Sequence, residues 1–158
     1  MGIDSTMVGG LPLPQRLLAL IDSGFWSRTA DDAMRQNSYS VVSAERIHLF
    51  APEENRIILY PPPFRTISEE MGGEMKGYWS EWGALEEISP DLAVPIGDFG
   101  LGSDTAVVLD YRSDRGNPSV IRLLWRQPPQ PNTWVRCADS FDEFVHMLEL
   151  DQGSPPLP

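Results

Sequence analysis

The residues best suited to chemistry lie together in one glycine-rich segment. Residues 95–110 read Pro-Ile-Gly-Asp-Phe-Gly-Leu-Gly-Ser-Asp-Thr-Ala-Val-Val-Leu-Asp, with carboxylates at Asp98, Asp104 and Asp110. Aspartate and serine oxygens are hard ligands of the kind that Ca²⁺ prefers, and glycines let a backbone approach a phosphate group closely. Three kinds of site therefore come into question: a phosphate cradle, a calcium site and a catalytic loop.

The spacing within this segment fits none of these sites. Gly97, Gly100 and Gly102 lack the spacing of a dinucleotide fingerprint, and no P-loop lysine follows them. Residues 98–100 spell the Asp-Phe-Gly of protein kinases, but a chain of 158 residues without the other kinase motifs cannot form that fold. The alternating acidic ligands and distal glutamate of an EF-hand are also absent. We interpret Gly97, Gly100, Gly102 and Asp110 as a structural loop, where glycines permit positive φ and aspartates bond nearby amides.

No other group of residues predicts catalysis. His48 and His146 are far apart in the sequence and lack metal-ligand spacing, and no nucleophile elbow anchors a Ser-His-Asp arrangement. Cys137, the only cysteine, lies in a strand-like segment and is interpreted as core filler rather than as a nucleophile. Paired carboxylates such as Glu86 and Glu87 are interpreted as solvated faces. We therefore predict a protein that is not an enzyme, with no catalytic residue, no metal and no cofactor.

The charge of the chain limits its partners. Twelve Lys and Arg residues stand against 23 Asp and Glu, which gives a net charge of −11. This charge would repel nucleic acid and anionic membranes, and it would attract a basic partner. An acidic surface that serves solubility alone is the alternative. The oligomeric state is left open.

Length and composition indicate one soluble domain. A chain of 158 residues is long enough for a single hydrophobic core. We predict a domain over residues 11–150, a loose leader over residues 1–10 and a flexible proline-rich tail over residues 151–158. The single cysteine, the absence of a secretion-signal pattern at the N-terminus and the short apolar runs predict a cytoplasmic location without membrane attachment.

The apolar pattern predicts helices near both ends of this domain. Leu17, Leu18 and Ile21 fall on one face of a helix that begins near Pro14 and ends at Gly24. Thr29 is the expected N-cap of a second, short helix. Ser140 and Glu143 form a capping-box pattern ahead of apolar residues spaced i, i+3, i+4 and i+7, which predicts a helix ending near residue 150.

Strands are predicted between these helices. Residues 56–60, 105–111, 119–125 and 133–136 have strand-like composition, and the turn-rich connection over 112–118 favours an antiparallel pair. Residues 64–78 are expected to form a mobile surface segment. Among the tryptophans, Trp125 and Trp134 are predicted to be core residues, whereas the sequence leaves the places of Trp79 and Trp82 open.

The order of these features resembles the SUKH superfamily, the Smi/Knr-type group. The resemblance covers residues 79–150 and is carried by Trp82-Gly83, Pro90-Asp91-Leu92, the Pro-Ile-Gly and Gly-Leu-Gly-Ser-Asp segments, the strand ending at Asp110 and residues 140–144. It implies an α+β single domain, mainly an antiparallel β-sheet flanked by N-terminal and C-terminal helices. Members of the family are not known as enzymes. Bacterial members are regarded as immunity proteins that neutralise toxins, often nucleases, and eukaryotic relatives act as interaction modules in cell-wall regulation.

Two hypotheses about function follow. The first is a non-catalytic bacterial immunity protein whose acidic surface binds a basic toxin domain. Its candidate contact residues are Glu69, Glu70, Glu74, Trp79, Glu81, Asp98 and Asp104. The alternative is a small hydrolase or a ligand- or metal-binding domain that uses the Asp98–Asp104 loop. Binding that weakens steeply with salt favours the first hypothesis, and a metal or small molecule held near Asp98 and Asp104 favours the second.

Overall fold

One antiparallel sheet organises the molecule. The structure is a computed structural model that describes residues 6–36, 41–100 and 105–151. Five strands follow one another across the sheet in the order β3-β4-β5-β6-β7, and each pairs antiparallel with its neighbour. The strands are β3 (Ile58–Leu59), β4 (Ala93–Asp98), β5 (Ala106–Asp110), β6 (Ser119–Leu124) and β7 (Thr133–Ala138), and a separate hairpin joins β1 (Met7–Val8) to β2 (Leu11–Pro12).

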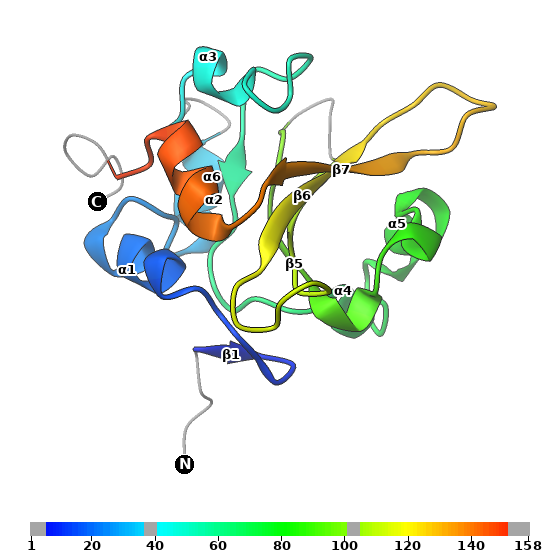
Figure 1. The fold of residues 1–158 in the computed structure, drawn as a ribbon, viewed down its shortest axis with the longest axis horizontal. Coiled ribbons are helices and arrows are strands. Elements are labelled where there is room, and N and C mark those ends of the chain that lie inside the picture. The colour runs from blue at the N-terminus through cyan, green and yellow to red at the C-terminus, as the bar shows by residue number, and fades with distance from the viewer. Residues whose placement is uncertain (1–5, 37–40, 101–104, 152–158) are drawn as a thin grey trace.

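Helices cover both faces of this sheet (Figure 1). One layer holds the helices from the two ends of the domain, and the other holds the short helices from its middle. The first layer is α1 (Gln15–Ser23), α2 (Ala30–Arg35), α3 (Ala44–Ile47) and α6 (Phe141–Leu148); the second contains α4 (Ile67–Glu70) and α5 (Lys76–Trp82), with the 3₁₀ turns η1 (Leu85–Glu87) and η2 (Pro90–Leu92) leading into β4. The predicted α+β class, a single domain with a mainly antiparallel sheet flanked by helices, is confirmed.

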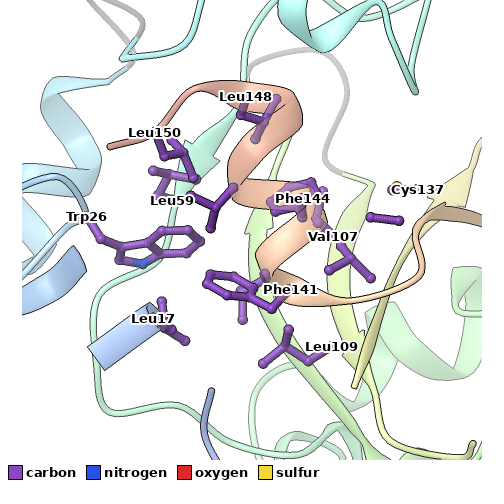
Figure 2. Close-up of a cluster of buried hydrophobic side chains, with 14 of the residues drawn as sticks. Leu17, Trp26, Leu59, Val107, Leu109, Cys137, Phe141, Phe144, Leu148 and Leu150 are labelled. Atoms are coloured by element: carbon purple, nitrogen blue, oxygen red, sulfur yellow. The ribbon is translucent and has the colours of Figure 1, made fainter. Parts of the chain in front are cut away.

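The larger core lies between the sheet and α6. Phe141 and Phe144 of α6 are buried, and the Phe141 ring lies 5.9 Å from that of Trp26, centroid to centroid. Figure 2 shows these rings above Val107 and Leu109 of β5, with Cys137 at the edge of the cluster. Cys137 is buried there, and burial raises the pKa of its thiol to about 12, which keeps it protonated near neutral pH.

A smaller core lies on the opposite face of the sheet. Trp79 of α5 and Ile67 of α4 pack there with Ala106 and Val108 of β5. Successive side chains of a strand point to opposite faces, so β5 sends alternate residues into the two cores. Because both faces are covered, β5 is apolar from Ala106 to Leu109, a continuous run that is more typical of a parallel strand.

Local signals place the ends of the predicted helices correctly. Gly24 closes α1 in the left-handed conformation, with φ of 87°. The Thr29 side chain accepts a hydrogen bond from the backbone N–H of Asp32 and caps α2. At α6 the Ser140 hydroxyl accepts from the Glu143 N–H at 3.1 Å, which is one half of the predicted capping box. None of the helices among the described residues is long and apolar enough to cross a bilayer.

Three expectations about the ends and the middle of the chain are corrected. Within the predicted loose leader, residues 7–10 belong to the β1–β2 hairpin, where Val8 is buried in the core. Residues 64–78, expected to be a mobile segment, contain α4 and the start of α5, both packed on the sheet. Trp125, expected in the core, lies beyond the end of β6 and is 49% exposed, because the sheet no longer covers it there.

Candidate functional site

Two adjoining hollows open beside α4 and α5. The first, called here the aromatic cavity, has a volume of about 500 Å³ and is lined by Tyr60, Glu70, Met75, Tyr78, Trp79, Pro95, Asp98 and Ala106. The second, called the glutamate hollow, has a volume of about 440 Å³ and is lined by Arg65, Glu69, Glu70, Gly73, Glu74 and Met75. The two share Glu70 and Met75, so they adjoin each other, and carboxylates line both.

A capping box fixes the glutamates of α4. The Thr66 hydroxyl accepts a hydrogen bond from the Glu69 N–H at 3.1 Å, and a Glu69 carboxylate oxygen accepts one from the Thr66 N–H at 2.9 Å. These reciprocal bonds satisfy backbone donors that the helix leaves unpaired. They set the direction of α4 and place the next residue, Glu70, at the border of the two hollows.

Glu70 is held by a tryptophan from α5. The indole N–H of Trp79 donates to a Glu70 carboxylate oxygen at 2.8 Å. Partial burial raises the pKa of Glu70 above its ordinary value, while this hydrogen bond and the charge of Arg65 act in the opposite direction. A positive charge entering the aromatic cavity would therefore relieve the cost of keeping the Glu70 carboxylate ionised.

Asp98 is held from the sheet side. The Tyr60 hydroxyl donates to one Asp98 oxygen at 2.7 Å, and the Gly100 N–H donates to the other at 2.7 Å. Burial, followed by the neighbouring Asp98 charge, raises the pKa of Tyr60 above its ordinary value. Tyr60 thus remains protonated and keeps donating to Asp98 across the accessible pH range.

The structure brings most of the predicted contact residues together. Glu69, Glu70 and Glu74 line the glutamate hollow, and Glu70, Trp79 and Asp98 line the aromatic cavity. Trp79 is only 2% exposed, so it is a wall of the cavity and part of the core rather than an open contact surface. Glu81 lies apart, in a different hollow beside Trp82 and Trp125. Asp104 and Gly102 fall outside the described residues.

The other residues of the predicted structural loop take up architectural positions. Gly97 and Asp98 belong to β4 rather than to the loop, and Gly97 pairs with Leu59 of β3. Gly100 follows the strand in a left-handed conformation with φ of 85°. Asp110 is buried at the end of β5 and forms an ion pair with Arg112, with 2.9 Å between Oδ2 and Nη2.

Replacing Gly97 with alanine is expected to lower the free energy of unfolding by about 1–3 kcal/mol. A Cβ at this position would lie 2.6 Å from the carbonyl oxygen of Ile58, which belongs to the backbone of β3 and cannot move without disturbing the pairing. Gly77→Ala is the matched control, because nothing lies within 4 Å of its Cβ position and alanine favours the α5 helix. Urea denaturation of both variants provides the measurement. Equal stabilities for the two variants would contradict the close approach of β3 and β4.

Sequence reasoning missed Tyr60, Tyr78 and Met75 as cavity residues. Tyr60 and Asp98 lie 38 positions apart in the chain, so their contact depends on the β3–β4 pairing. An available signal was the Thr66-Ile67-Ser68-Glu69 pattern, which predicts a helix start and hence an ordered segment before Trp79.

The arrangement suits binding of a positively charged group. Carboxylates and aromatic side chains line the same cavity, and an ammonium or guanidinium group is attracted to both. Within the described part of the chain, no group of three or more His, Cys, Asp or Glu side chains is placed to hold a metal ion. Comparisons with protein-family models, with curated proteins and with solved structures find no match to this chain.

Proposed function

We propose that this chain is a non-catalytic protein-binding domain of the cytoplasm, a bacterial immunity protein that neutralises a basic toxin domain through an acidic surface. The observation that carries the proposal is the gathering of Glu69, Glu70 and Glu74 around one hollow, beside a cavity that also contains Asp98. Among the residues that the structure describes, Arg65 is the only basic one that lines either hollow. The resemblance to the SUKH superfamily supports the immunity role in particular.

The electrostatics of the chain favour a basic partner. A net charge of −11 creates a field that steers positive surfaces toward the protein, and a hollow lined by carboxylates concentrates that field. Complementary charge raises the association rate and is screened by salt. The proposed complex should therefore weaken steeply as ionic strength rises.

The alternative hydrolase or metal site has less support from the geometry. Both carboxylate oxygens of Asp98 accept structural hydrogen bonds, one from Tyr60 and one from Gly100. An aspartate engaged in this way stabilises the end of β4, and no group of three or more His, Cys, Asp or Glu side chains in the described part of the chain is placed to hold a metal ion there. We therefore prefer the binding role.

The test of this proposal is protection against a toxin. Toxin domains found among the genes that neighbour the one for this chain would be expressed in a bacterial host with and without the chain, and cell survival and binding affinity would be measured. The variant Glu69→Gln/Glu74→Gln removes two charges, and glutamine at position 69 still completes the capping box. We expect it to bind about tenfold more weakly, which corresponds to about 1.4 kcal/mol.

A control with the same change in charge lies on the opposite layer. Glu45→Gln/Glu143→Gln alters exposed residues of α3 and α6 and should leave both affinity and protection unchanged. Absence of protection by the wild-type chain would refute the proposal. Equal effects of the two double variants would show that overall charge, rather than the glutamate hollow, governs binding.

A further inference from the structure

The aromatic cavity contains a combination of side chains that the acidic surface alone does not explain. Three aromatic residues, Tyr60, Tyr78 and Trp79, line it together with two carboxylates, Glu70 and Asp98. Each carboxylate is tied to one of the aromatic residues by a hydrogen bond, Trp79 to Glu70 and Tyr60 to Asp98. The charges are therefore held in place at the aromatic walls.

Trp79, one of these walls, packs against two other aromatic rings. The Trp79 ring stacks on Trp134, with centroids 6.4 Å apart and planes inclined by 18°, and it meets the Tyr78 ring edge-on at 4.9 Å. Pro95 of β4 and Ala106 of β5 line the cavity from the sheet, where their small side chains leave space. A cavity preorganised in this way loses little entropy when it binds a ligand.

The chemistry of the walls selects a cation with a flat face. Aromatic rings attract cations, and arginine does this more often than lysine because its planar guanidinium also stacks on rings. Carboxylates accept paired hydrogen bonds from the guanidinium fork, and a carboxylate oxygen that already accepts one hydrogen bond keeps a second lone pair. The chain's own Arg65 lines the glutamate hollow and is not among the residues that line the aromatic cavity.

We propose that the aromatic cavity receives the guanidinium group of one arginine side chain of the partner protein, between the carboxylates of Glu70 and Asp98. This inference rests on the proposed function, because the arginine belongs to the toxin domain. The glutamate hollow then supplies long-range attraction, and the aromatic cavity provides the anchor at the centre of the interface. Buried arginine anchors of this kind often carry most of the energy of a protein interface.

The first experiment uses a small probe and the intact chain. N-acetyl-arginine amide is titrated while assigned ¹H–¹⁵N spectra follow the indole N–H of Trp79, and N-acetyl-citrulline amide serves as a neutral analogue of nearly the same shape. We expect a saturable shift of the Trp79 indole signal with the arginine probe. The citrulline probe should bind at least tenfold more weakly, and N-acetyl-lysine amide should bind more weakly than the arginine probe because its ammonium cannot stack.

Glu70→Gln tests the role of the charge without removing the wall. The glutamine oxygen can accept the same hydrogen bond from Trp79, so the fold should be kept while the negative charge is lost. This variant should bind the arginine probe at least tenfold more weakly than the wild-type chain does. Glu45→Gln is the control with the same change in charge, because Glu45 is exposed on α3 in the opposite layer and does not line the cavity, and it should leave binding unchanged.

The outcomes separate this inference from the proposed function. Equal binding of the arginine and citrulline probes, or no shift with either, overturns the inference. Protection that survives Glu70→Gln but is lost in Glu69→Gln/Glu74→Gln also overturns it and leaves the proposed function standing. Loss of both probe binding and protection in Glu70→Gln supports it. The wild-type chain could also bind the arginine probe and yet give no protection. That result would show that the guanidinium does not come from a toxin, and it would refute both this inference and the proposed function.

Discussion

Trp79→Ala is expected to lower the free energy of unfolding by about 3–5 kcal/mol, whereas Trp82→Ala, three residues further along α5, should cost about 1 kcal/mol. Trp79 is 2% exposed, stacks on Trp134 and donates a hydrogen bond to Glu70, so its removal opens a cavity and leaves a partly buried carboxylate without its donor. Trp82 is 37% exposed, and its ring lies against that of Trp125, with centroids 4.9 Å apart.

The two tryptophans form an internal comparison, because they share a residue type and a helix. Chemical denaturation followed by far-UV circular dichroism gives the two free energies. The Trp79 variant should also show faster amide hydrogen exchange in α4 and α5, since that tryptophan joins α5 to the sheet and holds Glu70 of α4. Similar, small losses for both variants would contradict the smaller core as described.

The parts of the fold that depend on neighbouring residues were predictable from sequence. The helix after Ser140 follows from its cap and from the spacing of Phe141, Phe144 and Val145, all of which are buried in the structure. The antiparallel pairing of β5 and β6 follows from the turn-rich connection between them. In each case the information lies within about ten residues of sequence.

The parts that depend on tertiary packing were not predictable in this way. A spacing of three residues places Trp79 and Trp82 near each other on a helix surface, and only the position of the sheet decides that one is buried and the other exposed. Trp125 continues the apolar run of β6, so its sequence context predicts burial, but the strand ends at Leu124. The hydrophobicity of a side chain indicates its tendency to be buried. The layers of the fold determine which of the hydrophobic side chains are in fact covered.

The candidate site could be predicted only as a set of residue types. Acidic character pointed to Glu69, Glu70 and Glu74, which α4 and the turn after it bring to one hollow. The aromatic cavity is lined from β4, β5, α4 and α5 and by Tyr60, which follows β3, and no local pattern indicates that these segments meet. The glycine-rich segment over residues 95–110 contributes Asp98, whose place in β4 depends on the pairing of Gly97 with β3.

Phe144→Ala, in the larger core, should destabilise the protein as much as Trp79→Ala does in the smaller core. It is expected to lower the free energy of unfolding by about 3–5 kcal/mol. Phe144 is fully buried, and its ring lies 5.5 Å from Phe50 and 6.2 Å from Phe141, centroid to centroid. Leu49→Ala is the control in the same region, because Leu49 adjoins Phe50 but is 57% exposed and should cost well under 1 kcal/mol. Domains of this size are stable by about 5–15 kcal/mol, so the Phe144 variant would lose a large share of that total.

The shared sheet adds a second expectation for Phe144→Ala. Val107 and Leu109 of β5 belong to the larger core, while Ala106 and Val108 of the same strand belong to the smaller one. A strand cannot leave one core and remain in the other, so damage to the larger core should lower the stability of both layers together. Tryptophan fluorescence reports on Trp26 in one core and on Trp79 in the other, and circular dichroism reports on the whole fold. The transitions should coincide in a single step. Two separated steps would show that the two layers unfold independently and that β5 does not couple them.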